Sequence, residues 1–328
     1  MKPCNGVFEG GGVRGIGHVG AAWELERRGF SFVDLAGSSA GAMVAALLAA
    51  GYSSGELKEE LESLDYMKFK GRDILDLLGT FGKMLSIWLH FGIYDTDYLE
   101  QWMWKLLDRK GIRVFDDVAR LGRRLKITAS DLTSKHLLIL PDDLGELGLE
   151  PGAFPVALAV RMSVSIPVFF EPVRLKDRIG REHVIVDGGL LSNFPLWVLD
   201  DGSAGQVRPT LGFQFKSSQK ENCTGSWGAP CPERWNLIDH LKAIVSTCMD
   251  ATDQIHSLAG DPERTIRIPT EIGIDGEKKN VSAVDFNISR EESRALFENG
   301  RKAAACFAEE WDFDKWERKY RREQKGMP

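Results

Sequence analysis

The pentapeptide Gly37-Ser38-Ser39-Ala40-Gly41 separates two segments of different character. The apolar segment 32–36 predicts a strand, and the small-residue segment 42–50 predicts a helix. A G-x-S-x-G turn between strand and helix is typical of a nucleophile elbow, because small neighbours permit a tight turn that exposes the serine hydroxyl. The following helix N-terminus also favours negative charge beside Ser39. The pattern alone is equally compatible with a Gly/Ser-rich turn that has no catalytic role.

Composition narrows the classes of protein that this chain can represent. Its 328 residues are 43% hydrophobic and 27% charged, which indicates a globular protein with a sizeable core. The net charge of −6 argues against nucleic acid as a partner. The five cysteines are scattered without metal-ligand spacing, which indicates a reducing compartment and no bound metal. We therefore expect a soluble cytoplasmic protein.

The order of predicted elements favours a three-layer α/β/α fold with a mostly parallel central sheet, because the first fifty residues alternate strand and helix twice. We expect one catalytic domain over 1–312 and a basic, solvated tail over 313–328. The longest fully apolar run, 42–50, is too short to cross a bilayer, so membrane contact is expected to be peripheral, with the inner face of a membrane as an option. The predicted strands are 4–9, 32–36, 124–130, 136–140, 183–186, 210–215 and 264–269, and the predicted helices are 15–28, 42–50, 153–164, 236–258 and 290–311.

The glycine-rich stretch 10–15 admits two functional interpretations. Gly10, Gly12 and Gly15 fit the dinucleotide pattern G-x-G-x-x-G, with Asp34 as the ribose-binding acid of a nicotinamide or flavin enzyme. However, Asp34 lies inside the second predicted strand, whereas a ribose acid belongs at the end of its strand. Alternatively, converging backbone N–H groups at a helix N-terminus form an oxyanion hole. The glycine-rich loop and the loop with Ser39 are expected to follow adjacent parallel strands. The glycines and Ser39 should therefore meet at one edge of the sheet.

A serine nucleophile needs a base, and the sequence offers two kinds. His240 or His256 follows Ser39 in an order compatible with a histidine triad, but that fold places several strands before its elbow. Asp187 ends a predicted strand and precedes two glycines, so its carboxylate can project at the same sheet edge. An Asp-Gly turn without catalytic function is the plainer interpretation of Asp187.

Three motifs in this order resemble the patatin-like phospholipases: Gly10-Gly11-Gly12-Val13-Arg14-Gly15, Gly37-Ser38-Ser39-Ala40-Gly41 and Asp187-Gly188-Gly189. The likeness extends through Ser165-Ile166-Pro167 and Asn193-Phe194-Pro195, and it covers residues 5–200 well.

The resemblance implies a Ser–Asp dyad without histidine, metal or cofactor. Ser39 is then the nucleophile, Asp187 the base, Gly10, Gly11 and Gly12 the oxyanion donors, and Arg14 the support of that loop. Glu9, which directly precedes the glycines, is not required by the motif.

Together these observations predict a hydrolase that cleaves acyl esters of phospholipids or lysophospholipids and meets its substrate at a membrane surface. A dinucleotide-dependent oxidoreductase and a catalytically silent lipid-binding protein remain as alternatives. The wide apolar stripe over 74–91, interrupted by Gly79 and Gly82, fits either a lid that meets lipid or a core helix. The long polar loop 217–235 and the oligomeric state receive no assignment.

Overall fold

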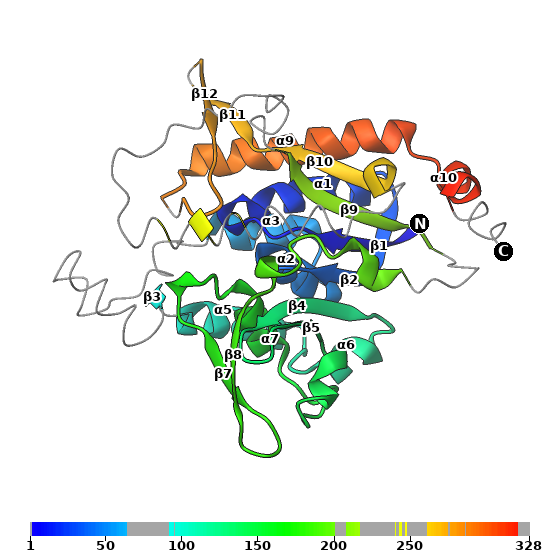
Figure 1. Cartoon of the computed structure of the whole chain (residues 1–328). Helices are drawn as coiled ribbons and strands as arrows, with labels where there is room; N and C mark the ends of the chain where they lie inside the picture. Colours follow the sequence, from blue (N-terminus) through cyan, green and yellow to red (C-terminus); the bar gives the residue numbers. More distant parts are fainter. Residues whose placement is uncertain are drawn as a thin grey trace.

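The computed structural model describes residues 2–63, 92–94, 96–200, 208–216, 240, 243, 244, 247, 261–274, 276–285 and 287–320. Its centre is an eight-stranded sheet in which five neighbouring strands run parallel (Figure 1). In spatial order the sheet contains β10 (Thr265–Pro269), β9 (Thr210–Lys216), β1 (Lys2–Phe8), β2 (Phe30–Gly37), β4 (Leu125–Asp131), β8 (Glu182–Asp187) and β7 (Val173–Lys176), and β5 (His136–Leu140) pairs with β4.

The register of the sheet brings the predicted site residues to one edge. Strands β1 and β2 are parallel neighbours, so the loops that follow them lie side by side. Gly37 is opposite Ile127 of β4, and Asp187 of the antiparallel β8 is opposite Ala129, two residues further along β4. Ser39 and Asp187 are therefore placed at a similar height along the strands.

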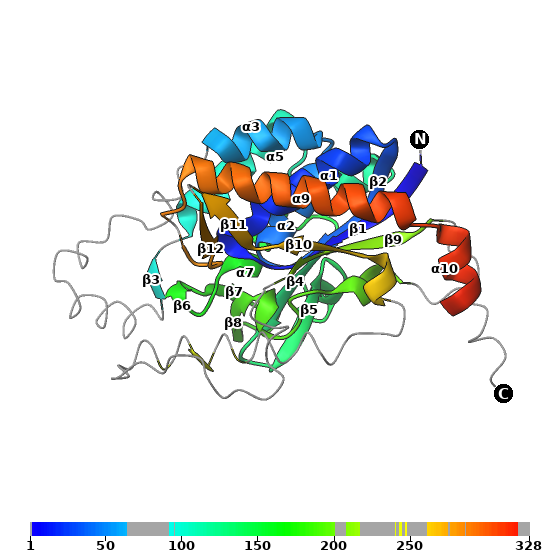
Figure 2. The ribbon, with the colours of Figure 1, turned by 90° about the horizontal axis from the view of Figure 1, so that it is seen from above.

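Helices cover one face of this sheet, where α1, α3, α5 and α9 are seen on the same side (Figure 2). Within this layer α1 packs extensively against α9, and α2 packs against the sheet at β2. The described helices are α1 (Gly15–Arg27), α2 (Ala40–Ala49), α3 (Ser54–Ser63), α5 (Asp97–Arg109), α6 (Phe115–Arg120), α7 (Val156–Val164), α9 (Arg290–Glu310) and α10 (Phe313–Tyr320). Short 3-10 turns are η1 (Gly12–Arg14), η4 (Asp142–Gly145), η5 (Gly188–Leu190), η6 (Leu196–Leu199) and η7 (Asp261–Arg264).

The central strands are buried on both faces, because successive side chains of a strand point to opposite sides. Phe8 and Leu35 belong to the large core that also contains the buried side chains of α1 and α2. Their neighbours Val7 and Ala36 pack on the other side against Leu196 of η6. Strands buried in this way read as continuous apolar runs, which is how segment 32–36 appears in the sequence.

The mixed α/β class and the mostly parallel sheet are confirmed. The predicted helix 236–258 lies largely outside the described residues. The sequence analysis did not predict β7, the pairing of β3 (Gly92–Tyr94) with β6 (Val168–Phe170), or the hairpin of β11 (Glu271–Ile274) and β12 (Glu277–Asn280).

The described part of the C-terminal tail forms a helix whose basic side chains Lys315, Arg318 and Lys319 are exposed. Residues 313–320 form α10, and the Trp316 ring is only 7% exposed. The guanidinium of Arg264 lies 5.1 Å from the centre of this ring. The predicted lid or core segment 74–91 and the loop 217–235 fall outside the described residues. Among the helices of the described part, none has the length and apolar character needed to cross a membrane.

Candidate active site

Ser39 occupies the sharp turn between β2 and α2. Its backbone has φ 51° and ψ −126°, a conformation that costs a non-glycine residue about 1–3 kcal/mol. The turn also needs glycine at position 41, because a Cβ there would lie 2.1 Å from the carbonyl oxygen of Phe8. Strain and close backbone approach together are what a nucleophile elbow requires.

Two hydrogen bonds hold this strained turn in place. The Ser39 N–H donates to the Ser163 hydroxyl on α7 at 2.9 Å, and the Ser38 N–H donates to the Phe8 carbonyl at 3.2 Å. Both serines at the turn are buried. The elbow is thus anchored to β1 on one side and to α7 on the other.

Asp187 ends β8 and caps the short turn η5. Its Oδ1 accepts a hydrogen bond from the Gly189 N–H at 2.7 Å, and its own N–H donates to the Ser165 carbonyl at 2.9 Å. The second oxygen, Oδ2, is buried and makes no hydrogen bond of standard geometry with a described residue. Catalytic hydrogen bonds often align fully only when substrate is bound, so this atom is suited to receive a proton from a neighbour.

Burial raises the pKa of Asp187 from 3.8 to about 7. Hydrogen bonding from the Ser39 hydroxyl and from the Gly189 N–H acts in the opposite direction, because it favours the carboxylate. A buried carboxyl group beside a serine hydroxyl, with a pKa near neutrality, has the properties of a general base.

The glycine-rich loop after β1 lies beside this pair. The Gly10 N–H donates to the Asn193 carbonyl at 3.0 Å, whereas the N–H groups of Gly11 and Gly12 have no acceptor among the residues that the structure describes. Gly12 has φ +55°, and a Cβ there would lie 1.9 Å from the Ala283 carbonyl oxygen. The Nε of Arg14 donates to the Gly11 carbonyl at 3.1 Å. The N–H groups of Gly11 and Gly12 are therefore available for a ligand, and Arg14 holds the Gly11 carbonyl that lies between them.

Sequence reasoning missed a buried network around Glu9 and Asn193. The Asn193 side-chain amide donates to Glu9 Oε1 at 3.4 Å and to the Gly10 carbonyl at 3.5 Å. Glu9 Oε2 accepts from the Phe215 N–H of β9 at 2.5 Å. Asn193 follows Asp187 by six residues, so it joins the glycine loop to the loop that carries the candidate base. A charged residue at the end of an apolar strand was the available signal for Glu9.

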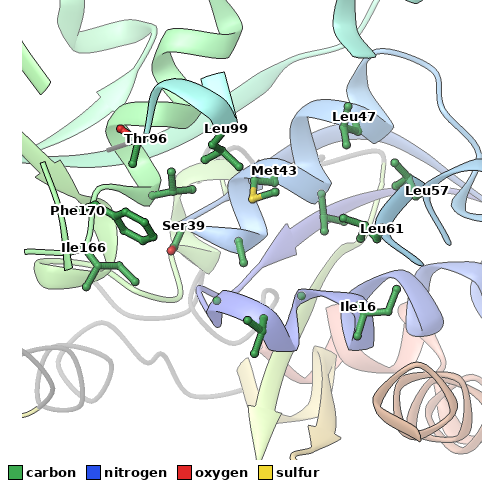
Figure 3. A pocket seen from close by; sticks show the side chains of 16 residues that line it. Ile16, Ser39, Met43, Leu47, Leu57, Leu61, Thr96, Leu99, Ile166 and Phe170 are labelled. Carbon is green, nitrogen blue, oxygen red and sulfur yellow. The ribbon is translucent and has the colours of Figure 1, made fainter. Parts of the chain in front are cut away.

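An apolar pocket opens from Ser39. Figure 3 shows Ser39 near Thr96, Ile166 and Phe170 at one end, with Met43 between Ser39 and the leucines at the other end. Among the described residues that line it, Ser39 and Thr96 supply the hydroxyl groups. The remaining described lining residues are Gly12, Val13, Gly15, Ile16, Ala40, Met43, Val44, Leu47, Leu57, Leu61, Leu99, Val164, Ile166 and Phe170.

Asp34, the acid of the dinucleotide hypothesis, is engaged by two arginines. Asp34 is buried within β2, where Arg124 contacts its carboxylate at 2.8 Å and Arg208 at 3.3 Å, so it is not presented to a ribose at the strand end. Nδ1 of His183 lies 2.6 Å from Asp131, and Nε2 of His18 lies 2.8 Å from the Glu9 carbonyl. His240 is exposed, and His256 lies outside the described residues. In the described part of the chain, no three His, Cys, Asp or Glu side chains cluster as metal ligands.

Two other proteins are similar to this chain along most of its length. The protein YqhO of Bacillus subtilis is 39% identical over 314 residues, which covers 94% of this chain and 99% of that relative. The protein R571 of Acanthamoeba polyphaga mimivirus is 26% identical over 308 residues, which covers 91% of each chain. The relationship therefore extends well beyond the three motifs and includes the C-terminal third.

Solved structures share the fold. VipD from Legionella pneumophila superposes with a TM-score of 0.55 at 18% identity, and the match covers 94% of this chain and 66% of VipD. The type III effector ExoU, from Pseudomonas aeruginosa, superposes with a TM-score of 0.50 at 15% identity and a coverage of 94% of this chain and 53% of ExoU. This chain thus spans about two thirds and half of the lengths of these two proteins.

The family profile described as patatin-like phospholipase matches residues 6–200, more than half of the chain. This match includes all three predicted motifs and confirms the resemblance to this family. The chain belongs to the patatin-like phospholipase family, which at the family level makes it a lipid acyl hydrolase.

Proposed function

We propose that this protein cleaves acyl esters of phospholipids or lysophospholipids, with Ser39 as nucleophile and Asp187 as general base. The observation that carries the proposal is the position of Ser39. It stands in a strained turn, lies beside a buried carboxyl group whose pKa is raised to about 7, and opens onto an apolar pocket. An ester carbonyl held beside Ser39 would direct its acyl chain into that pocket.

In the acylation step, the Asp187 carboxylate takes the hydroxyl proton of Ser39 while the serine oxygen attacks the ester carbonyl carbon. The tetrahedral intermediate carries its negative charge on the former carbonyl oxygen. When it collapses, the bond to the alcohol oxygen breaks, and protonated Asp187 returns the proton to that leaving group. The lysophospholipid or glycerophospho-alcohol departs, and the acyl group remains esterified to Ser39.

We assign stabilisation of the intermediate to the N–H groups of Gly11 and Gly12. Gly10 was expected as a third donor, but its N–H is engaged by the Asn193 carbonyl. Each backbone donor aimed at a developing oxyanion contributes about 3–4 kcal/mol to the lowering of the barrier. Since a carboxylate is a weak base for a serine hydroxyl, catalysis depends on these donors and on a site from which water is largely excluded.

Deacylation uses the same groups in the same roles. Asp187 takes a proton from a water molecule, which attacks the acyl carbon of the acyl-enzyme. Collapse of this second intermediate breaks the bond to Ser39, whose oxygen regains the proton, and the free fatty acid leaves. No metal or cofactor takes part in this scheme. Because lipid substrates of this class reside in membranes, we further propose that the protein contacts a membrane surface peripherally.

A hydrolysis panel tests the proposal. Phospholipids, lysophospholipids and short-chain soluble esters are incubated with the wild-type protein and with Ser39→Ala, and released fatty acid is measured. Release from at least one lipid class by the wild type, and its loss in Ser39→Ala, supports the proposed function. Saturable lipid binding without any hydrolysis would instead favour the silent lipid-binding protein.

A further inference from the structure

The apolar pocket follows one face of helix α2. Ser39, Met43 and Leu47 are spaced by four residues, so their side chains lie along the same side of the helix. The view in Figure 3 runs along this face, from Ser39 past Met43 to Leu47, with Leu57 and Leu61 of α3 beyond it. The pocket thus has a catalytic end at Ser39 and a distal end at α3.

The distal end is a packed wall. Leu47 and Leu57 are at most 1% exposed, and Leu61 is 6% exposed. Leu57 and Leu61 are four residues apart, so they present one face of α3 to the pocket. An acyl chain that reaches this face meets the side chains of Leu47, Leu57 and Leu61.

Helix α3 is tied to both of its neighbours. At its N-terminus the Ser54 N–H donates to Glu26 of α1 at 3.1 Å. On the other side, Arg109 pairs with Glu60 at 2.7 Å, and Lys110 pairs with Glu56 at 2.8 Å. These contacts with α1 and α5 oppose outward movement of the wall formed by Leu57 and Leu61.

The distance from Ser39 to this wall limits the length of the acyl chain that fits in the pocket. Eight residues separate Ser39 from Leu47, which corresponds to about 12 Å along the helix axis. An extended hydrocarbon advances by about 1.3 Å per carbon, given a C–C bond of about 1.5 Å. About nine carbons of an acyl chain therefore fit between the ester and the wall.

We infer that this pocket measures the acyl chain, and that Leu57 and Leu61 set its upper length. The inference rests on the proposed function. Below the limit, each added methylene enters the pocket and raises kcat/KM by up to about fourfold, the equivalent of burying one CH₂ group. Beyond about nine carbons, the chain meets α3 and further methylenes no longer raise kcat/KM.

The test measures kcat/KM for linear p-nitrophenyl esters from butanoyl to hexadecanoyl, with each ester below its aggregation concentration. The wild type should show a rise that ends near the octanoyl and decanoyl esters. Leu61→Ala should move this break to longer chains, and Leu61→Phe should move it to shorter ones. If Leu61→Ala does not fold, the milder truncation Leu61→Val should also move the break to longer chains.

Leu107→Ala is the control, because Leu107 on α5 is also buried but is not among the described residues that line the pocket. It should lower the melting temperature without moving the break. A rise without a break in the wild type, or a break that Leu61 variants leave in place, would overturn the inference while leaving ester hydrolysis intact.

Binding separates this inference from the proposed function. Free fatty acids of the same lengths displace a fluorescent fatty acid from the Ser39→Ala protein, and Kd is plotted against chain length. A break in Kd that shifts with Leu61→Ala supports the measured length even if no ester is hydrolysed. Chain-length dependence that is identical in the Ser39→Ala protein and its Leu61→Ala derivative contradicts it.

Discussion

Ser39 stands between two regions that are built by different interactions. On one side, hydrogen bonds between main-chain and buried polar groups join the glycine loop to Asn193 and hold Asp187 against Gly189. On the other side, apolar side chains of α2 and α3 surround a pocket through van der Waals contact. Hydrogen bonds are directional and their loss leaves a buried group unsatisfied, whereas apolar contacts respond gradually to a change of volume.

This difference predicts how the two regions respond to substitution. Changes on the hydrogen-bonded side should act mainly on kcat, because the groups there are proposed to contact the reacting atoms or to position groups that do. Changes on the apolar side should act mainly on the preferred acyl chain and on stability. The following experiments test this separation.

The largest effect is expected for Asp187→Asn. An asparagine cannot accept the Ser39 proton, so the rate of ester hydrolysis should fall by about 10³–10⁴-fold. The double variant with Ser39→Ala should be little worse than either single variant, because members of a catalytic unit act together. Initial rates with a soluble short-chain ester measure this. Activity close to wild type in Asp187→Asn, or its loss in His240→Ala or His256→Ala, would indicate a histidine base instead.

Asn193→Ala should come next in size. It removes the side-chain donor to Glu9 and to the Gly10 carbonyl, so the loop that carries Gly11 and Gly12 loses its alignment. A small displacement of such groups costs about 10²-fold, so kcat should fall by about 10–100-fold with KM for a short ester nearly unchanged.

The comparison for Asn193 is Asn193→Asp, which keeps the size of the side chain but replaces the amide donor by a carboxyl group that faces Glu9 Oε1. It should reproduce the loss in kcat. If the loss appears only as a lower melting temperature, with kcat per folded molecule unchanged, the network supports the fold and does not position the loop.

The pH dependence should report Asp187. Because its pKa is raised to about 7, kcat/KM for a neutral ester should fall about tenfold per pH unit below that value and level off above it.

The free energy of unfolding should change with pH in the opposite direction to kcat/KM. The pKa of Asp187 in the folded state lies above its ordinary value of 3.8, so the stability it contributes is complete below about pH 4 and is lost as pH rises through 7.

Asp187→Asn provides the check on this sign. The variant removes the cost of a buried carboxylate, so it should melt at a higher temperature than wild type near pH 8 and at a similar temperature near pH 4. Melting curves at both pH values measure the difference. A variant that is less stable than wild type near pH 8 would mean that ionised Asp187 is stabilised more than burial destabilises it.

No effect is expected from metal removal. The described residues contain no cluster of metal-ligating side chains, and the proposed chemistry uses none. Hydrolysis in the presence of EDTA should therefore proceed at the untreated rate. Loss of activity that calcium restores would contradict this expectation.

The hydrogen-bonded region around Ser39 and Asp187 could largely be predicted from the sequence, because short sequence motifs determine its turns. The turn around Ser39 needs small residues within five positions, and Asp187 is followed directly by its glycines. The contact between Glu9 and Asn193 could not be predicted, since 184 residues separate them and no local pattern reports such a contact. The same applies to the engagement of the Gly10 N–H by the Asn193 carbonyl.

The pocket was not predicted, for a different physical reason. Met43, Leu47, Leu57 and Leu61 have the apolar character of ordinary core residues, and they differ from the core only in facing open space. Which apolar side chains line a pocket depends on how helices from distant parts of the chain pack together. By contrast, the parallel sheet could be predicted, because continuous apolar runs that alternate with predicted helices are visible in the sequence.

The central claim is that Ser39 becomes acylated by an ester substrate. Mass spectrometry of the protein after treatment with a long-chain alkyl fluorophosphonate tests it directly, because this reagent forms a stable adduct with an activated serine. The account predicts one adduct per chain, located on the peptide that contains Ser39, and greatly slowed labelling in Asp187→Asn. Labelling of another residue, or equal labelling rates in wild type and Asp187→Asn, would contradict it.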